Sequence, residues 1–135
     1  MKSKSIFVDT SGLLCLHDVT EKRHDDAIGL VTSARRLFTT NYVLTEFVPL
    51  SEVRGHDRNE ALTFLIDFLL VPRLELIWIE PNSHNAAMQL LQDRLDKTYS
   101  LCDAVSFVVM REQGLTDALT TDRHFEQEGF VRLLK

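Results

Sequence analysis

SIFVD, residues 5–9, is a short apolar run that ends in an aspartate, and this pattern predicts a buried β-strand. The residues that follow, SGLLCLHD (11–18), predict a short helix. Four further apolar or β-rich runs recur along the chain. They span residues 37–40, 74–80, 118–121 and 130–134. Because helical patterns separate the runs, we predict an α/β fold, with a parallel sheet covered by helices on both faces.

Five longer helical patterns lie between the predicted strands. They span residues 21–36, 42–53, 57–71, 81–96 and 100–114. Asn41 is a favoured N-cap for the second helix, and Pro49 is expected to kink or shorten it. The alternation continues without linkers or repeats, which predicts a single domain over residues 1–135.

Composition is that of a soluble globular protein, with 44% hydrophobic and 26% charged residues. Cys15 and Cys102 are too few for a disulfide framework, so we expect reduced thiols and a cytoplasmic location. No secretory signal is expected, because no long apolar segment follows the N-terminal lysines. The longest apolar run, residues 62–71, is about half of the ~20 residues that a membrane span needs.

Four acidic residues are expected at one edge of the predicted sheet. Asp9 and Asp122 each follow an apolar strand, and parallel strands present both at the carboxyl edge, where sites form in such sheets. Glu46 lies in the first turns of the helix after the second strand, and Asp103 lies in the first turn of its own helix. Because helices that follow strands begin at that edge, we expect the four carboxylates to converge on one crevice.

Four converging carboxylates predict a divalent metal site. Like charges repel one another and raise pKa values, and a hard cation relieves that repulsion. Mg²⁺ and Mn²⁺ prefer oxygen ligands, and they support hydrolysis of phosphodiesters. The net charge of −5 argues by itself against a nucleic-acid-binding protein, but two bound divalent ions would bring it to −1.

Each acid also has an ordinary structural interpretation, and both interpretations stay open. Asp103 stands three residues after Ser100, which is the spacing of a capping box. Asp9, in DTSG, could cap the next helix, and Asp122 could open the turn DRHF. Glu46 taken alone fits a surface helix residue. The joint pattern is more informative than any single acid.

Two other acids, Asp96 and Asp117, are weaker candidates for function. Asp96 is expected in a loop within reach of the crevice, and Asp117 is expected in a plain turn. Among the five histidines, which show no ligand spacing, only His124 falls near the site, and we expect it to pack within a loop. Trp78 is expected in the core.

Four blocks of the sequence resemble the signature blocks of PIN-domain proteins, most closely the VapC-type toxins of bacterial toxin–antitoxin pairs. The blocks are IFVDTSG, TNYVLTE, SLCDAVSFVVM and ALTTDRHFEQEGF. The resemblance covers essentially the whole chain. It implies a three-layer α/β/α PIN-like fold with a central parallel sheet. It also implies an endoribonuclease that uses one or two Mg²⁺ or Mn²⁺ ions.

The resemblance assigns roles to particular residues. The positions of the family's metal-binding and catalytic acids are occupied by Asp9, Glu46, Asp103 and Asp122. Three hydroxyls are expected to support these acids through hydrogen bonds. They belong to Thr10, Ser11 and Thr120.

The resemblance also implies three partners, namely an RNA substrate, a cognate antitoxin protein and a second copy of the chain in a homodimer. Six basic residues near predicted helix starts or loops are candidates for contact with RNA, although each also fits an ordinary surface charge. They are Lys22, Arg23, Arg54, Arg58, Lys97 and Arg123.

Two other functions compete with a nuclease. A non-catalytic module could bind a metal or a partner at the acidic edge. A phosphoryl-transfer protein could use Asp9 as its phospho-acceptor, but it would need a lysine at a late strand end, where this chain has Arg123.

Overall fold

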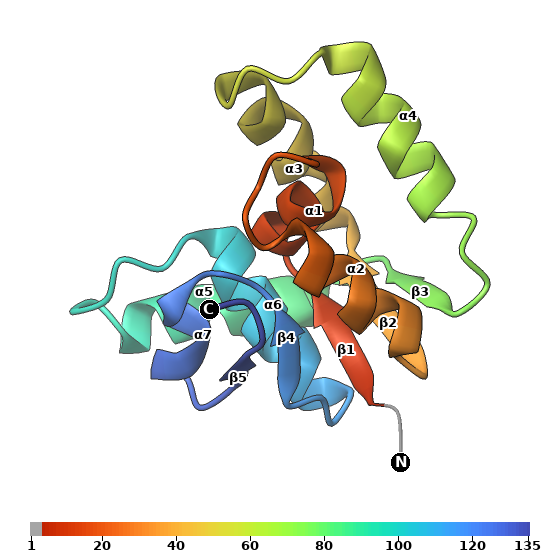
Figure 1. Ribbon diagram of the computed structural model, residues 1–135. Coiled ribbons are helices and arrows are strands. Elements are labelled where there is room, and N and C mark those ends of the chain that lie inside the picture. The colour runs from red at the N-terminus through yellow and green to blue at the C-terminus, as the bar shows by residue number, and fades with distance from the viewer. Residues whose placement is uncertain (1–3) are drawn as a thin grey trace.

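The computed structural model describes residues 4–135, which contain five strands (Figure 1). They are β1 (Ser5–Val8), β2 (Arg36–Thr40), β3 (Leu74–Ile77), β4 (Asp117–Leu119) and β5 (Val131–Arg132). Their order across the sheet is β3-β2-β1-β4-β5, and every neighbouring pair is parallel. The predicted α/β class is confirmed, and the carboxyl ends of the strands share one edge.

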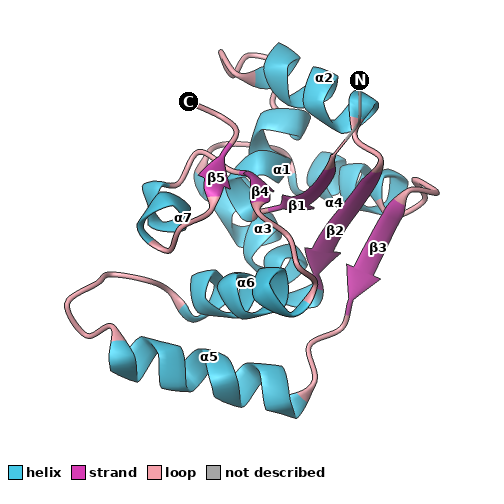
Figure 2. Ribbon diagram, turned by 90° about the horizontal axis from the view of Figure 1, so that it is seen from below, coloured by secondary structure: helices cyan, strands magenta, loops and turns pink. Residues whose placement is uncertain are grey.

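Seven helices connect these strands within the described residues. They are α1 (Thr10–His17), α2 (His24–Ser33), α3 (Asn41–Val53), α4 (Arg58–Phe68), α5 (Pro81–Asp93), α6 (Leu101–Glu112) and α7 (Arg123–Gln127). Figure 2 shows α1 and α2 on one side of the sheet and α5 and α6 on the other, which is the predicted three-layer arrangement. The pair α3 and α4 extends beyond the sheet, with α4 outermost (Figure 1). In the part of the chain described here, every helix is too short or too polar to cross a membrane.

The central strand of the sheet is β1, which lies between β2 and β4. Its Phe7 pairs in register with Phe38 on one side and Ala118 on the other, and Phe7 is fully buried. Because helices cover both faces of the sheet, the sequence of this strand is continuously apolar. Because β1 and β4 are neighbours, Asp9 and Thr120, which follow them, emerge side by side.

The predicted N-cap of α3 needs correction. Its N-cap is Thr40 rather than Asn41, because the Thr40 hydroxyl accepts a hydrogen bond from the backbone N–H of Val43 at 3.2 Å. The Asn41 side chain instead accepts a bond from the Ile79 backbone N–H at 2.8 Å, which ties α3 to the segment after β3. Pro49 lies inside α3, and the helix continues past it to residue 53.

The run predicted to form a strand over residues 74–80 is a strand only at residues 74–77. Trp78, which was expected in the core, is 67% exposed. β3 is the edge strand, so one of its sides has no neighbouring strand, and the chain leaves the sheet early to begin α5. Cys15 and Cys102 are free thiols, as predicted.

Gly12 is where α1 approaches the sheet most closely. A Cβ atom at this position would lie 2.1 Å from the backbone oxygen of Leu119, the last residue of β4. Only glycine therefore lets α1 pack against the end of β4. This close approach brings the start of α1 to the residues that follow β4.

We predict that Gly12→Ala destabilises the protein by about 1–3 kcal/mol or more, because backbone atoms must move to admit the methyl group. Gly29→Ala is the matched control. Gly29 lies within α2 with no atom within 4 Å of the new Cβ, and alanine there should stabilise the helix by about 0.5–1 kcal/mol. Urea denaturation of the two variants measures both effects. Equal stability of the two variants would contradict the close approach.

Candidate functional site

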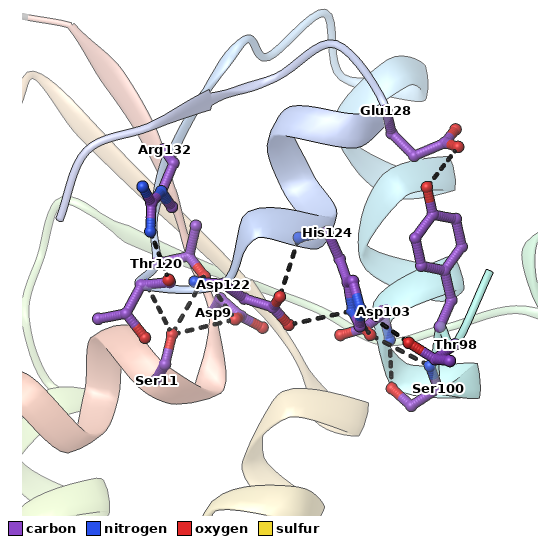
Figure 3. A network of polar contacts seen from close by, with 12 residues as sticks. Asp9, Ser11, Thr98, Ser100, Asp103, Thr120, Asp122, His124, Glu128 and Arg132 are labelled. Carbon is purple, nitrogen blue, oxygen red and sulfur yellow. Dashed lines mark hydrogen bonds and ion pairs between the residues drawn. The ribbon is translucent and has the colours of Figure 1, made fainter. Parts of the chain in front are cut away.

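Asp9 lies at the carboxyl end of β1, and its side chain is 4% exposed. It occupies the N-cap position of α1, yet its side chain makes no capping hydrogen bond. Its Oδ2 instead accepts hydrogen bonds from the Thr120 hydroxyl at 2.9 Å and the Ser11 hydroxyl at 3.3 Å (Figure 3). The capping interpretation of Asp9 is therefore wrong, and the carboxylate is held across β1 and β4.

Asp103 is both a capping residue and a member of the site. The Ser100 hydroxyl accepts a bond from the Asp103 backbone N–H at 2.9 Å, and Asp103 Oδ2 accepts one from the Ser100 backbone N–H at 3.1 Å. This is the capping box that the spacing predicts. The same Oδ2 lies 3.0 Å from Nδ1 of His124. Asp103 therefore fits both interpretations that the sequence left open, as a helix cap and as a residue of the site.

Asp122 and His124 lie at the start of α7, close to Asp103. Asp122 caps this helix, since its Oδ1 accepts a hydrogen bond from the His124 backbone N–H at 2.9 Å. The imidazole Nδ1 of His124 lies 3.4 Å from Asp122 Oδ2 and also faces Asp103 (Figure 3). The expectation that His124 only packs in a loop is wrong. Its position two residues after Asp122, in a first helical turn, was the available sequence signal.

Asp103, Asp122 and His124 form a group whose ligand atoms all lie within 4.8 Å of one another. Among residues 4–135, it is the one group of three or more such side chains with this spacing. Two carboxylates and an imidazole can bind a divalent cation. The two carboxylates offer the oxygen ligands that Mg²⁺ and Mn²⁺ prefer, and a histidine that the prediction did not include lies beside them.

Glu46 lies in the second turn of α3 and is half-buried. Its charge contributes to raising the pKa of Asp9 and is the largest charge effect on the pKa of Cys102, which burial already raises. Glu46 therefore lies near Asp9 and Cys102, and its place among the converging acids stays a prediction.

The electrostatics of the crevice disfavour ionised carboxylates. Burial raises the pKa of Asp9 to about 7, and the nearby charge of Asp103 adds to this effect. Burial also raises the pKa of Asp103, against hydrogen bonds from Ser100 and His124 that lower it. A bound cation would offset these costs, because it favours the ionised form of its ligands.

The supporting hydroxyls differ in their contacts. Ser11 and Thr120 bond Asp9, and the Thr120 hydroxyl also accepts a bond from the Asp122 backbone N–H at 3.0 Å. Thr10 is buried, but within residues 4–135 its hydroxyl has no hydrogen-bond partner. Two of the three predicted hydroxyls therefore position the site, and both act on Asp9.

The weaker acidic candidates lie apart from this network. Asp96 is exposed and pairs with Lys97 at 3.7 Å. Asp117 is not in a turn as expected, because it begins β4, is 3% exposed and lies 3.3 Å from the Lys4 ammonium group. It therefore belongs to the amino edge of the sheet, opposite the site.

The six basic candidates for RNA contact are divided by the fold. Arg23 and Arg54 line one cavity together with Ser11, next to Asp9. The remaining four are exposed at scattered positions. They are Lys22, Arg58, Lys97 and Arg123.

Comparisons with known proteins agree with this architecture. A family model described as PIN domain matches residues 6–130. The chain is 33% identical over 129 residues to the 23S rRNA-specific endonuclease VapC20 of Mycobacterium tuberculosis, covering 95% of this chain and 97% of that protein.

Two solved structures are similar in fold. The crystal structure of Mycobacterium tuberculosis VapC20, described as a Sarcin-Ricin loop cleaving toxin, matches with a TM-score of 0.84 and 29% identity, covering 93% of this chain and 96% of that one. VapBC2 from Rickettsia felis, bound to a DNA fragment from their promoter, matches with a TM-score of 0.66 and 13% identity, covering 95% and 96%. The second similarity concerns the fold alone.

We predict that the metal-free protein loses stability as the pH rises from about 4 to about 7. The pKa of Asp9 is about 7 in the folded chain and 3.8 in the unfolded chain, so the folded state binds more protons in this window. Asp9→Asn removes this penalty. It should raise the free energy of unfolding by roughly 2–4 kcal/mol at pH 8 and change it little at pH 4.

Urea denaturation in EDTA at the two pH values measures this difference. Asn at position 9 keeps a side-chain oxygen for the bonds from Ser11 and Thr120, so the comparison isolates the charge. A variant that is equally destabilised at both pH values would show that the burial of Asp9 carries no charge penalty.

Proposed function

The chain belongs to the PIN domain family, and we propose that it is a metal-dependent endoribonuclease, the toxin of a type II toxin–antitoxin pair. The observation that carries this proposal is the 33% identity to a named 23S rRNA endonuclease over nearly the full length of both chains. The acidic crevice at the carboxyl edge of the sheet supports the same activity.

One or two Mg²⁺ or Mn²⁺ ions would be held by Asp9, Glu46, Asp103 and Asp122, with His124 beside them. The fit rests on the raised pKa values of Asp9 and Asp103 and on the ligand atoms of Asp103, Asp122 and His124, which lie within 4.8 Å of one another. When bound, the metal lowers the pKa of a water molecule and neutralises charge on the phosphodiester.

The contribution of the chain is to position these acids. Ser11 and Thr120 orient Asp9 by donating hydrogen bonds to its Oδ2. The capping box fixes Asp103 at the start of α6. His124 lies between Asp103 and Asp122, so its ring limits the rotation of both carboxylates. Such positioning lets the phosphodiester meet a preorganised site.

The proposed partners are RNA, an antitoxin protein and a second copy of the chain, in the cytoplasm. Large apolar side chains on α4 support a protein partner. Ile66 is 62% exposed, and Leu70, just beyond the helix, is 74% exposed. The similarity to VapBC2 is one of fold, so it suggests a toxin–antitoxin architecture without identifying the antitoxin.

The second candidate function is a non-catalytic module that binds a metal or a partner. The capping role of Asp103 favours it, because this acid has a structural reason to be present without any catalysis. Variants of Asp103 and Ser100 separate the two functions.

We predict that the purified protein cleaves a mixed RNA pool with Mg²⁺ or Mn²⁺ and does not cleave it with EDTA. Asp103→Asn should reduce cleavage at least 100-fold, because it removes a charged metal ligand. Ser100→Ala is the matched control. It removes the other half of the capping box and should cost about 1 kcal/mol of stability, with cleavage retained.

Gel analysis of the RNA and thermal unfolding of each variant provide the two readouts. If Ser100→Ala and Asp103→Asn lose stability equally and no metal yields cleavage, the nuclease proposal is wrong. Metal binding without cleavage in the wild type would then favour the binding module.

A further inference from the structure

A cavity of ≈ 100 Å³ begins beside Asp9 and follows α1 away from the acidic crevice. Ser11, Leu14, Cys15 and Asp18 line it from α1 and from the residue just after that helix. Their spacing of three, four and seven residues places them on one helix face. This face is about 10 Å long, since a helix rises 1.5 Å per residue.

The near end of the cavity is joined directly to the site. The Ser11 hydroxyl, which donates to Asp9 Oδ2, also accepts a hydrogen bond from the Thr121 backbone N–H at 3.0 Å. Ser11 and Thr121 both line the cavity. A ligand that fills the cavity would therefore reach Ser11, which contacts Asp9.

The far end of the cavity brings together two segments distant in sequence. Arg23 and Glu21 come from the turn between α1 and α2, and Arg54 and His56 come from the end of α3. Gly55, with φ of 87°, permits the tight turn. In that turn, the His56 backbone N–H bonds the Ser51 oxygen at 2.9 Å. This helix-ending motif fixes Arg54 and His56 toward α1.

The polar groups in the cavity are only partly used within the protein. Arg23 Nη1 lies 3.0 Å from Glu21 Oε1, and within the described residues its buried Nε–H has no hydrogen-bond partner. His56 Nε2 lies 3.4 Å from Asp18 Oδ2. Across residues 4–135, Arg54 makes no ion pair. The guanidinium group of Arg54 is therefore available to a ligand in the cavity.

The charges in the cavity balance, because Asp18 and Glu21 oppose Arg23 and Arg54. A phosphate would meet two carboxylates there, so the balance favours a neutral polar ligand with both donors and acceptors. Guanine is the nucleobase that offers two adjacent acceptors, O6 and N7, to a guanidinium group. It also offers two adjacent N–H donors, which a carboxylate can accept together.

We propose that this cavity is a subsite for an unstacked guanine base of the RNA, next to the bond that is cut. The inference rests on the proposed nuclease function for its substrate class. Arg54 and Arg23 donate to O6 and N7, the Glu21 carboxylate accepts from the N–H groups, and Leu14 contacts the base plane. Recognition of splayed-out bases by their edges is the usual way in which proteins read single-stranded RNA.

The first test measures binding without catalysis. The four nucleoside 5′-monophosphates and inorganic phosphate are titrated in EDTA while the His56 ring resonances are followed by NMR. GMP should bind at least 5-fold more tightly than AMP, CMP or UMP, in line with the usual discrimination of a bidentate arginine–guanine pair. Arg54→Gln should remove this preference.

Arg36→Gln is the matched control for this test. Arg36 is an exposed arginine at the start of β2, on the opposite edge of the sheet, and it pairs with Glu75 at 3.1 Å. The control should keep the preference for GMP. Equal binding of all four nucleotides, or full competition by inorganic phosphate, would overturn the guanine subsite.

The second test examines cleavage. Products from a randomised RNA pool are sequenced, and the wild type should show guanine enriched at one position next to the cut. Arg54→Gln should lose this enrichment and at least 5-fold in kcat/KM, while Arg36→Gln keeps both. Cleavage without any guanine preference would overturn the subsite and leave the nuclease intact. A preference for GMP in a protein that cleaves no RNA would overturn the nuclease and leave the subsite intact.

Discussion

The site depends on one constraint, the burial of the Asp9 carboxylate at the junction of β1 and β4. A carboxyl group there is almost excluded from water, and burial raises its pKa to about 7. Two hydroxyls and the close approach of α1 at Gly12 hold it in place. The fold thus stabilises an arrangement that its own electrostatics oppose. A cation bound there would offset that cost, and part of its binding free energy would go into ionising the acids.

Asp103 shows how a structural role and a functional role can share one side chain. Its capping box satisfies backbone donors that would otherwise be unpaired at the start of α6. The same bonds hold the carboxylate where it faces His124 and Asp122. A cap is therefore not evidence against a ligand. It is a way to position one, because the side-chain rotamer is already determined by the helix that it begins.

Much of the fold could be predicted from sequence because its signals are local. Apolar runs that lead into Asp9 and Asp122 mark two of the strands, and the Ser100–Asp103 spacing marks a helix start. The exposure of Trp78 could not be predicted, because it depends on where the sheet ends rather than on the residue itself. The contacts of His124 were missed for a similar reason, although the residue was placed near the site. No ligand spacing links it to another histidine, and its partner Asp103 lies in α6, 21 residues earlier.

The cavity beside α1 could not be predicted from the sequence, because its lining residues come from segments that are distant along the chain. Arg23 and Arg54 are thirty-one residues apart, and nothing in either sequence context distinguishes them from surface charges. They meet because α1 packs against both α2 and α3. A chain with a net charge of −5 cannot hold RNA by long-range attraction alone. In the proposed nuclease, affinity would come from short-range contacts at a metal and at a small number of bases, and the polar cavity that Ser11 joins to Asp9 would supply the selectivity.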